Sequence, residues 1–378
     1  IGANEEAIRY HQALSETDES VGAYLSDCFE CYDTSTTVLT THQRALFIDW
    51  NHNTIIFDED ILGVLLPISK ITINDLVRLE TALENDNDKA ILQGLISDIT
   101  LGKISSPRSL ETSIFQDFNA IEESVLTCQL RYDGDILHFF DASYFVVDSR
   151  DKATIHYVRQ YEDKLPVDKK IIILSATSNE TLYRHLFGDR LKFYDIGNVE
   201  LTGFIEQDTR YSFSRSSLSR KIGQAIEKVG DLPTITFAKF KSQFPNPVED
   251  IHFGKVSGFD DLKGKDIAVM GTPHINPIVL SLYTSVLEMP VRASDFNKIG
   301  QQCVTHNGFR FWFHAYDNEH LRLLQFYFIE SELKQAVGRA RANTELAYVH
   351  LYSNYPLPES AINEEEKAIG KQRLEDAR

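Results

Sequence analysis

Cysteine is scarce in this sequence, which limits the metal and disulfide chemistry that it can support. The four cysteines are Cys28, Cys31, Cys128 and Cys303; they give one Cys-x-x-Cys pair, with no second pair and no His-x-x-x-His partner downstream. A structural zinc site needs four convergent ligands, so this pattern argues against one. We expect free thiols in a reducing compartment, the alternative being a redox pair at Cys28 and Cys31.

Long apolar runs are also missing. No uninterrupted stretch approaches the roughly 18 residues needed to span a bilayer, and the N-terminus lacks the basic-then-apolar pattern of a signal peptide. The sequence therefore predicts a cytoplasmic protein without a membrane partner. Because the first residue is Ile1 rather than Met, we expect a processed or engineered fragment, or the ordered part of a longer chain.

Positive charge is in deficit, because 38 Lys and Arg residues face 56 Asp and Glu residues, for a net charge of −18. Non-specific affinity for nucleic acid comes largely from Lys and Arg side chains that neutralise phosphates, so this balance argues against a general DNA-coating protein. It leaves room for a motor that holds a strand in a local groove with backbone amides and hydroxyls.

The 378 residues are too many for one ordinary core, and we expect two or three domains. Short β-branched or aromatic runs alternate with helical segments, which predicts an α/β fold with mostly parallel sheets. The expected strands are residues 36–39, 54–57, 144–148, 170–174, 191–195, 234–238, 251–255, 266–270 and 347–351. Two of them, 54–57 and 170–174, are near-continuous apolar runs that end in polar residues, as expected for buried parallel strands with functional carboxyl ends.

The same patterns divide the chain into parts. We assign residues 1–64 and 138–198 to a first lobe, 65–137 to a helical insertion in it, 199–355 to a second lobe and 356–378 to a C-terminal tail. The insertion contains an acidic run at residues 84–88. The tail is highly charged, and we expect a solvated helix or a frayed end there.

Two adjacent carboxylates, Asp58 and Glu59, follow the strand at 54–57, and Asp60 comes next. Magnesium prefers oxygen ligands and retained waters, and a neighbouring carboxylate can polarise an attacking water. These residues are therefore candidates for metal-assisted hydrolysis of a phosphate. An acidic triplet alone is more often a solvated turn, and that alternative remains open.

Two hydroxyls, Ser175 and Thr177, follow the strand at 170–174. We expect chemistry just after this strand, as after the strand at 54–57. Ser and Thr are also favoured helix N-caps, so the alternative is a purely structural cap.

Arginines form a third candidate group, with Gln335, Gly338, Arg339 and Arg341 in one short run. A plain amphipathic helix is the alternative, in which Gly338 in mid-helix costs about 1 kcal/mol. Glycine there permits close approach of another group. Arginines spaced by two can reach across a cleft and stabilise negative charge on a γ-phosphate.

In this order, a strand-borne Asp-Glu pair, Ser-Ala-Thr and Gln-x-x-Gly-Arg-x-Arg resemble the motif series of superfamily 2 helicases, and the last block looks like the Dicer-type and RNA-sensor branch. The resemblance implies two RecA-like lobes with ATP between them, DNA or RNA as the partner, and ATP and Mg²⁺ as ligands. The implied roles follow the motifs. Asp58 holds magnesium through water, Glu59 activates the hydrolytic water, Ser175 and Thr177 couple nucleotide state to strand binding, and Gln335, Arg339 and Arg341 contact ATP, with Arg341 as arginine finger.

Weaker matches lie between these motifs. For nucleic-acid binding they are Thr40, Thr41, His42, Phe237, Lys239, Gly271 and Thr272, and for ATP binding Gly258 and Asp260. A structural turn is an equal alternative at Gly271 and Thr272. The aromatic run Phe309, Phe311, Trp312, Phe313 and Tyr316 alternates like a hairpin strand, and we interpret it as core rather than as a base-stacking platform.

The chain departs from the family in two respects. No Gly-x-x-x-x-Gly-Lys-Ser/Thr phosphate loop occurs, so we expect that the fragment begins after that loop and alone hydrolyses ATP poorly. The spacing from Asp58 to Ser175 is about three times that of compact members. This spacing is the reason for assigning an insertion, which could separate strands as a wedge or bind a protein partner.

The function hypothesis is an ATP-dependent helicase or translocase; the alternative is a non-catalytic RecA-like scaffold that binds nucleic acid or protein. A metal-dependent nuclease fits poorly because no further residue completes a two-metal site.

Overall fold

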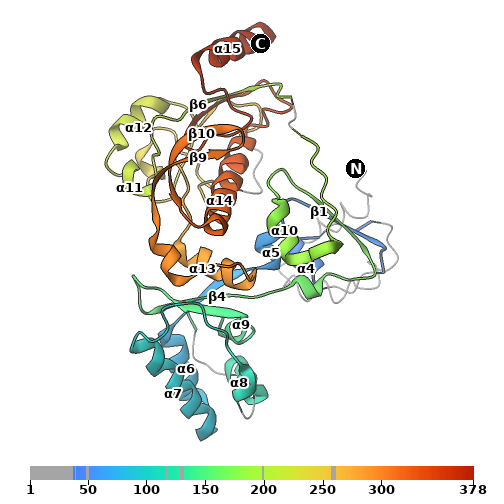
Figure 1. Ribbon diagram of the computed structural model, residues 1–378, viewed down its shortest axis with the longest axis vertical. Helices are drawn as coiled ribbons and strands as arrows, with labels where there is room; N and C mark the ends of the chain where they lie inside the picture. The colour runs from blue at the N-terminus through green and yellow to red at the C-terminus, as the bar shows by residue number, and fades with distance from the viewer. Residues whose placement is uncertain are drawn as a thin grey trace.

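The computed structural model describes residues 37–38, 40–47, 51–115, 118–127, 132–197, 200–256 and 261–378. The predictions at Cys28, Cys31, Cys128, Gly258 and Asp260 lie outside the described residues, as do both ends of the expected strand at 36–39. Cys303 is an exposed free thiol. The fold mixes helices with parallel sheets in two separate parts of the chain, which confirms the α/β prediction (Figure 1).

The larger parallel sheet, called the second sheet here, has four strands in the order β6-β11-β8-β7. They are β6 (Phe204–Asp208), β11 (Tyr348–Tyr352), β8 (Ile267–Met270) and β7 (Thr234–Ile235). The central strand β8 is buried along its whole length, as a continuous Ile-Ala-Val-Met run predicts for a parallel strand covered on both faces. Helices α12 (Ile222–Val229) and α14 (Glu319–Gly338) contribute to the core around it.

The first sheet pairs β1 (Thr54–Asp58) with β5 (Lys170–Leu174) in parallel, so two predicted strands are confirmed as neighbours. The expectation that both are buried is wrong for one face of the sheet. Ile56 is 58% exposed and Leu174 47% exposed, whereas Phe57 is 1% exposed. Among the described residues, the face of the sheet that carries Ile55 and Phe57 is the one that packs into a hydrophobic core.

The predicted insertion, residues 65–137, shares a sheet with residues assigned to the first lobe. Strands β2 (Ile68–Thr72), β4 (Thr154–Val158) and β3 (Tyr144–Val147) form an antiparallel sheet in the order β2-β4-β3, and β2 lies in the insertion whereas β3 and β4 lie after residue 138. Its helices are α6 (Ile73–Ala82), α7 (Asp86–Thr100), α8 (Phe118–Thr127) and α9 (Ile136–Phe140). A capping box between Thr72 and Asp75 starts α6, and Asn85 caps α7, so the acidic run at 84–88 is a helix start.

Helix α13 (Pro277–Val286) lies between the β2-β4-β3 sheet and helix α14. It packs against β3, β4 and α14, and its apolar residues join a core with α5 (Leu62–Leu65) and α10 (Glu180–Phe187). The hydroxyl of Tyr283 on α13 donates to the carbonyl oxygen of Leu66 at 3.3 Å. The second sheet is therefore anchored to the segment that follows β1.

Two expected strands are wrong. Residues 191–195 form no strand, and residues 251–255 contain only an isolated bridge between His252 and Lys255. The aromatic run is a strand, β10 (Phe309–Tyr316), paired antiparallel with β9 (Ile299–His306). Phe313 and Tyr316 are buried, as the core interpretation requires, whereas Trp312 is 68% exposed. The remaining short elements are α4 (His42–Ala45), α11 (Arg215–Leu218), η1 (Thr112–Ile114), η2 (Glu162–Lys164), η3 (Gly188–Arg190), η4 (Lys241–Gln243) and η5 (Ala293–Asn297).

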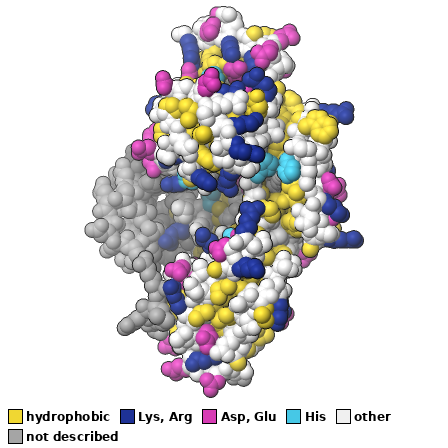
Figure 2. Space-filling view, turned by 90° about the vertical axis from the view of Figure 1, so that its left-hand side faces the viewer, with side chains coloured by type: hydrophobic (Ala, Val, Ile, Leu, Met, Phe, Trp, Pro, Cys, Tyr) yellow, Lys and Arg dark blue, Asp and Glu magenta, His cyan; other side chains and the backbone are white. Residues whose placement is uncertain are grey.

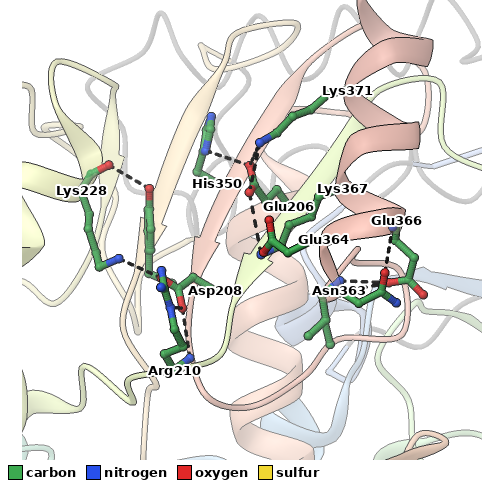
Figure 3. Close-up of polar contacts among 12 residues, drawn as sticks. Glu206, Asp208, Arg210, Lys228, His350, Asn363, Glu364, Glu366, Lys367 and Lys371 are labelled. Carbon is green, nitrogen blue, oxygen red and sulfur yellow. Dashed lines mark hydrogen bonds and ion pairs between the residues drawn. The ribbon is translucent and has the colours of Figure 1, made fainter.

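The expected charged tail contains a helix with one docked face, α15 (Glu364–Ala377). Lys371 and Lys367 pair with Glu206 on β6 (Figure 3). Gly370 lies against the ring of Phe204, where an added Cβ would come within 1.9 Å of a ring carbon. Glycine at this position therefore sets how closely α15 approaches the sheet.

We predict that Gly370→Ala lowers the free energy of unfolding by about 1–3 kcal/mol, because the new methyl group overlaps a buried ring. Urea denaturation followed by circular dichroism measures this. The matched control is Gly223→Ala on α12, where an added Cβ meets nothing within 4 Å and better helix propensity should stabilise by up to about 1 kcal/mol. Equal effects of the two substitutions would contradict the docking contact.

Candidate functional site

The first sheet brings two predicted motifs to one edge. Asp58 pairs in register with Leu174, and the backbone N–H of Glu59 donates to the carbonyl oxygen of Leu174 at 2.9 Å. Because β1 and β5 are parallel, the carboxylates after β1 and the hydroxyls after β5 leave the sheet on the same side.

Glu59 has an unusual backbone. Its φ is 133°, a region that L side chains rarely adopt. Asp58 and Glu59 are both exposed. Such strain in a non-glycine residue concentrates at functional sites, where the surrounding structure maintains it. Here the hydrogen bond from Glu59 to β5 fixes the strained residue at the sheet edge.

Ser175 and Thr177 hold the turn after β5. The Ser175 hydroxyl accepts from the backbone N–H groups of Thr177 and Ser178, each at 3.0 Å. Neither residue caps α10, because Asn179 is the N-cap and accepts from the backbone of Leu182. The cap alternative is therefore wrong for both hydroxyls. Thr177 instead contacts Asp60, with 3.5 Å between the Thr177 hydroxyl and one carboxylate oxygen.

Asp60 is the centre of this site, and its role was not predicted. Its carboxylate accepts from the hydroxyl of Tyr183 at 2.8 Å and from the backbone N–H of Leu62 at 2.9 Å. The Tyr183 hydroxyl in turn accepts from the buried backbone N–H of Ile61 at 3.0 Å. Tyr183 lies 123 residues away in the sequence, so no local motif could have indicated this contact.

Tyr327 on α14 lies within the electrostatic influence of Asp60. Burial, and then the negative charge of Asp60, raises the pKa of Tyr327 well above its usual range. The pKa of Tyr183 is raised in the same way, first by burial and then by Asp60. Both phenols therefore remain protonated at neutral pH and keep a donor next to the carboxylate.

The arginine group lies at the far end of α14. Gly338 is the last residue of the helix rather than a mid-helix residue, and an added Cβ there would meet nothing within 4 Å. No described residue therefore approaches Gly338 so closely that position 338 requires glycine. Arg339 is buried and its Nε donates to the carbonyl oxygen of Gln335 at 3.2 Å. Arg341 is exposed and has a φ of 54°.

These two halves of the predicted ATP site are apart in this structure. Tyr327, which interacts with Asp60, and Gly338 are separated by 11 residues of helix, or about 16 Å along its axis. The carbonyls of Ala340 and Ala342 accept from Gly264 and Gly203, which precede β8 and β6. The arginine group thus lies at the amino ends of the second sheet, and its role in ATP binding stays a prediction.

The first-lobe candidates for nucleic-acid binding lie at the start of α4. Thr41 is the N-cap, and its hydroxyl accepts from the backbone of Arg44 at 3.4 Å. The ring of His42 packs edge-on against Phe57 with 5.6 Å between centroids. Thr40 and Thr41 are exposed, so their hydroxyls are accessible.

The second-lobe candidates converge at the carboxyl ends of the second sheet. Phe237 follows β7, and Gly271 and Thr272 follow β8; an added Cβ on Gly271 would come within 2.7 Å of the Phe237 ring. Phe237 and Thr272 are buried, and the Thr272 hydroxyl donates to the carbonyl oxygen of Ser212 at 2.6 Å. These two side chains hold the edge together, while Lys239 is exposed.

Among the described residues, no group of three or more His, Cys, Asp or Glu side chains is arranged to hold a metal ion. Asp58 offers one exposed carboxylate, which suits a magnesium ion bound through water and substrate phosphates better than a closed protein cage. No helix in the described ranges has the length and apolar character to cross a membrane.

No protein-family model matches the chain, and no curated protein matches it in sequence. Among solved structures, it is similar to one described as an XPD helicase, with 12% identity and a TM-score of 0.44 over 95% of this chain and 78% of that chain. A second, described as the apo form of XPD, gives 13% identity and a TM-score of 0.45 over 88% and 78%. At this level the likeness assigns no activity or ligand to the chain.

We predict that Tyr183→Phe destabilises the protein by about 1–3 kcal/mol, because it leaves the buried N–H of Ile61 without an acceptor and removes a donor from Asp60. Chemical denaturation of the full-length protein measures this. The control is Tyr194→Phe, at a side chain that is 79% exposed, which should change stability by less than about 0.5 kcal/mol. If both variants match the wild type, the Asp60 contacts are not energetically significant.

Proposed function

We propose that this chain is the motor portion of an ATP-dependent helicase or translocase, with the phosphate loop supplied by an upstream segment of the same protein. The observation that best supports this is the meeting of Asp58, Glu59 and Asp60 with Ser175 and Thr177 at one sheet edge. The order of these motifs along the sequence carries the family resemblance, and the parallel register of β1 with β5 supports the proposal because it brings the two motifs together.

The residues at this edge have distinct tasks in the proposal. Bound magnesium would neutralise charge on the phosphates, and Asp58 would hold it through water. Glu59 would orient the attacking water and accept its proton. The strained backbone of Glu59 is consistent with a carboxylate held in one orientation rather than in a relaxed turn.

In this proposal, Asp60 couples the sheet edge that carries Asp58 and Thr177 to helix α14. One oxygen faces Thr177 and the other faces Tyr183, while Tyr327 reaches the same carboxylate from α14. A displacement of the sheet edge would therefore be transmitted to α14, the helix that leads to Arg339 and Arg341. Closure of the second lobe over ATP would bring these arginines to the phosphates, and such closure is how motors of this kind change their grip on a strand.

A non-catalytic scaffold is the second candidate. The separation between Asp60 and the arginine end of α14 favours it, because an arginine that stays at the amino ends of the second sheet could not reach a nucleotide at Asp58. Nucleic-acid or protein binding without turnover would then be the function.

We predict that Glu59→Gln lowers ATP turnover of the full-length protein at least about 100-fold, because the amide cannot accept a proton. ATPase activity is measured with and without single-stranded and double-stranded DNA and RNA. The control is Glu288→Gln, at an exposed glutamate that also has a positive φ, 51°, but lies after α13. Turnover unchanged in Glu59→Gln would reject Glu59 as the base, and no wild-type turnover with intact nucleic-acid binding would support the scaffold.

A further inference from the structure

A basic, serine-rich segment connects β6 to α12. Residues 209–226, called the Ser-Arg segment here, contain Arg210, Arg215, Arg220, Lys221 and five serines but no Asp or Glu. The whole chain has 56 acidic and only 38 basic residues, so this composition is a local reversal of the overall charge. Interleaved arginines and hydroxyls are the groups that contact phosphate oxygens in nucleic acids.

The Ser-Arg segment packs on the carboxyl edge of the second sheet. The carbonyl of Ser212 accepts from the Thr272 hydroxyl, and the carbonyl of Phe213 lies 3.2 Å from where a Cβ on Gly271 would be. Phe213 is fully buried and has a φ of 43°. The segment is therefore held in a defined conformation beside the turn after β8.

A second segment without acidic residues, 232–248, meets the first one there and contributes Lys239 and Lys241. The guanidinium of Arg215 lies over the ring of Phe237 at 5.2 Å, and the Lys239 ammonium lies over the ring of Phe240 at 5.8 Å. The two rings are 6.4 Å apart. Basic groups from separate parts of the chain are thus neighbours, each lying over one of two adjacent phenylalanine rings.

Local acidic groups neutralise only part of this charge. Asp208 accepts from Arg210 and Lys228, as Figure 3 shows, and although burial opposes the shift, these hydrogen bonds hold the pKa of Asp208 below its usual range. Glu332 acts on Arg215 but is engaged by the backbone N–H of Gly254 at 2.7 Å. Within the described part of the chain, the exposed side chain of Arg220 makes no hydrogen bond or ion pair.

We propose that the Ser-Arg segment binds the phosphodiester backbone of a nucleic-acid strand, with Arg215 and Arg220 as the main phosphate contacts and exposed serine hydroxyls as donors. This inference rests on the proposed function. On the side of the molecule that carries α11 and α12, Figure 2 shows several Lys and Arg side chains on one face. An acidic peptide is the competing partner; we favour a strand because interleaved arginines and hydroxyls are the groups that contact phosphate oxygens along a nucleic-acid backbone.

The test is binding of fluorescein-labelled dT20 and U20 to the full-length protein without nucleotide, followed by anisotropy between 50 and 200 mM KCl. Each lost phosphate contact should reduce the slope of log affinity against log salt by about 0.7, which is about fivefold in affinity at 0.1 M. Arg220→Gln should show this loss, and the double variant Arg215→Gln with Arg220→Gln about 25-fold. Arg220 has no structural contact that its substitution would break, so the single variant isolates the charge.

The matched control is Lys263→Gln, which removes one positive charge near the amino ends of the second sheet, where Lys263 pairs with Glu345 at 3.3 Å. Its affinity and salt slope should equal those of the wild type. Equal weakening by Lys263→Gln, no effect of Arg220→Gln, or equal displacement by polyglutamate of the same charge would each overturn the inference. Wild-type protein that binds neither probe would reject the nucleic-acid function itself, so the two failures are distinguishable.

Discussion

The arrangement of the candidate site depends on one carboxylate. Asp60 accepts from Tyr183 and from the backbone of Leu62, contacts Thr177, and interacts with Tyr327 on α14. Hydrogen bonds to a charged acceptor are stronger than neutral ones, and partial burial strengthens them further. One side chain thereby joins the turn after β1 to the turn after β5 and to α10, and its charge acts on Tyr327 of α14.

The parts of the site that sequence could predict are those that depend on local order. A strand followed by acidic residues, and another followed by hydroxyls, identify Asp58, Glu59, Ser175 and Thr177, and the parallel register of β1 with β5 then brings them together. Tyr183 and Tyr327 could not be found in this way, because burial near a distant carboxylate leaves no pattern in the neighbouring sequence.

The same distinction explains the errors in the fold prediction. Strands β2 and β4 were missed because their polar residues, among them Lys70 and His156, interrupt the apolar pattern, and only antiparallel pairing makes them strands. Residues 191–195 alternate as a strand should, but no described strand pairs with them. An alternating pattern permits a strand, but it does not supply the neighbouring strand with which it must pair.

Helix α14 links the surroundings of Asp60 to the arginines at its far end. It is a single 20-residue helix whose first half interacts with Asp60 and whose last residue precedes the arginines. A rigid rod converts a small tilt at one end into a larger displacement at the other: a 10° tilt about Tyr327 would move Gly338 by about 3 Å, given about 16 Å of helix between them. A small tilt of α14 would therefore move the arginines by about the length of a hydrogen bond.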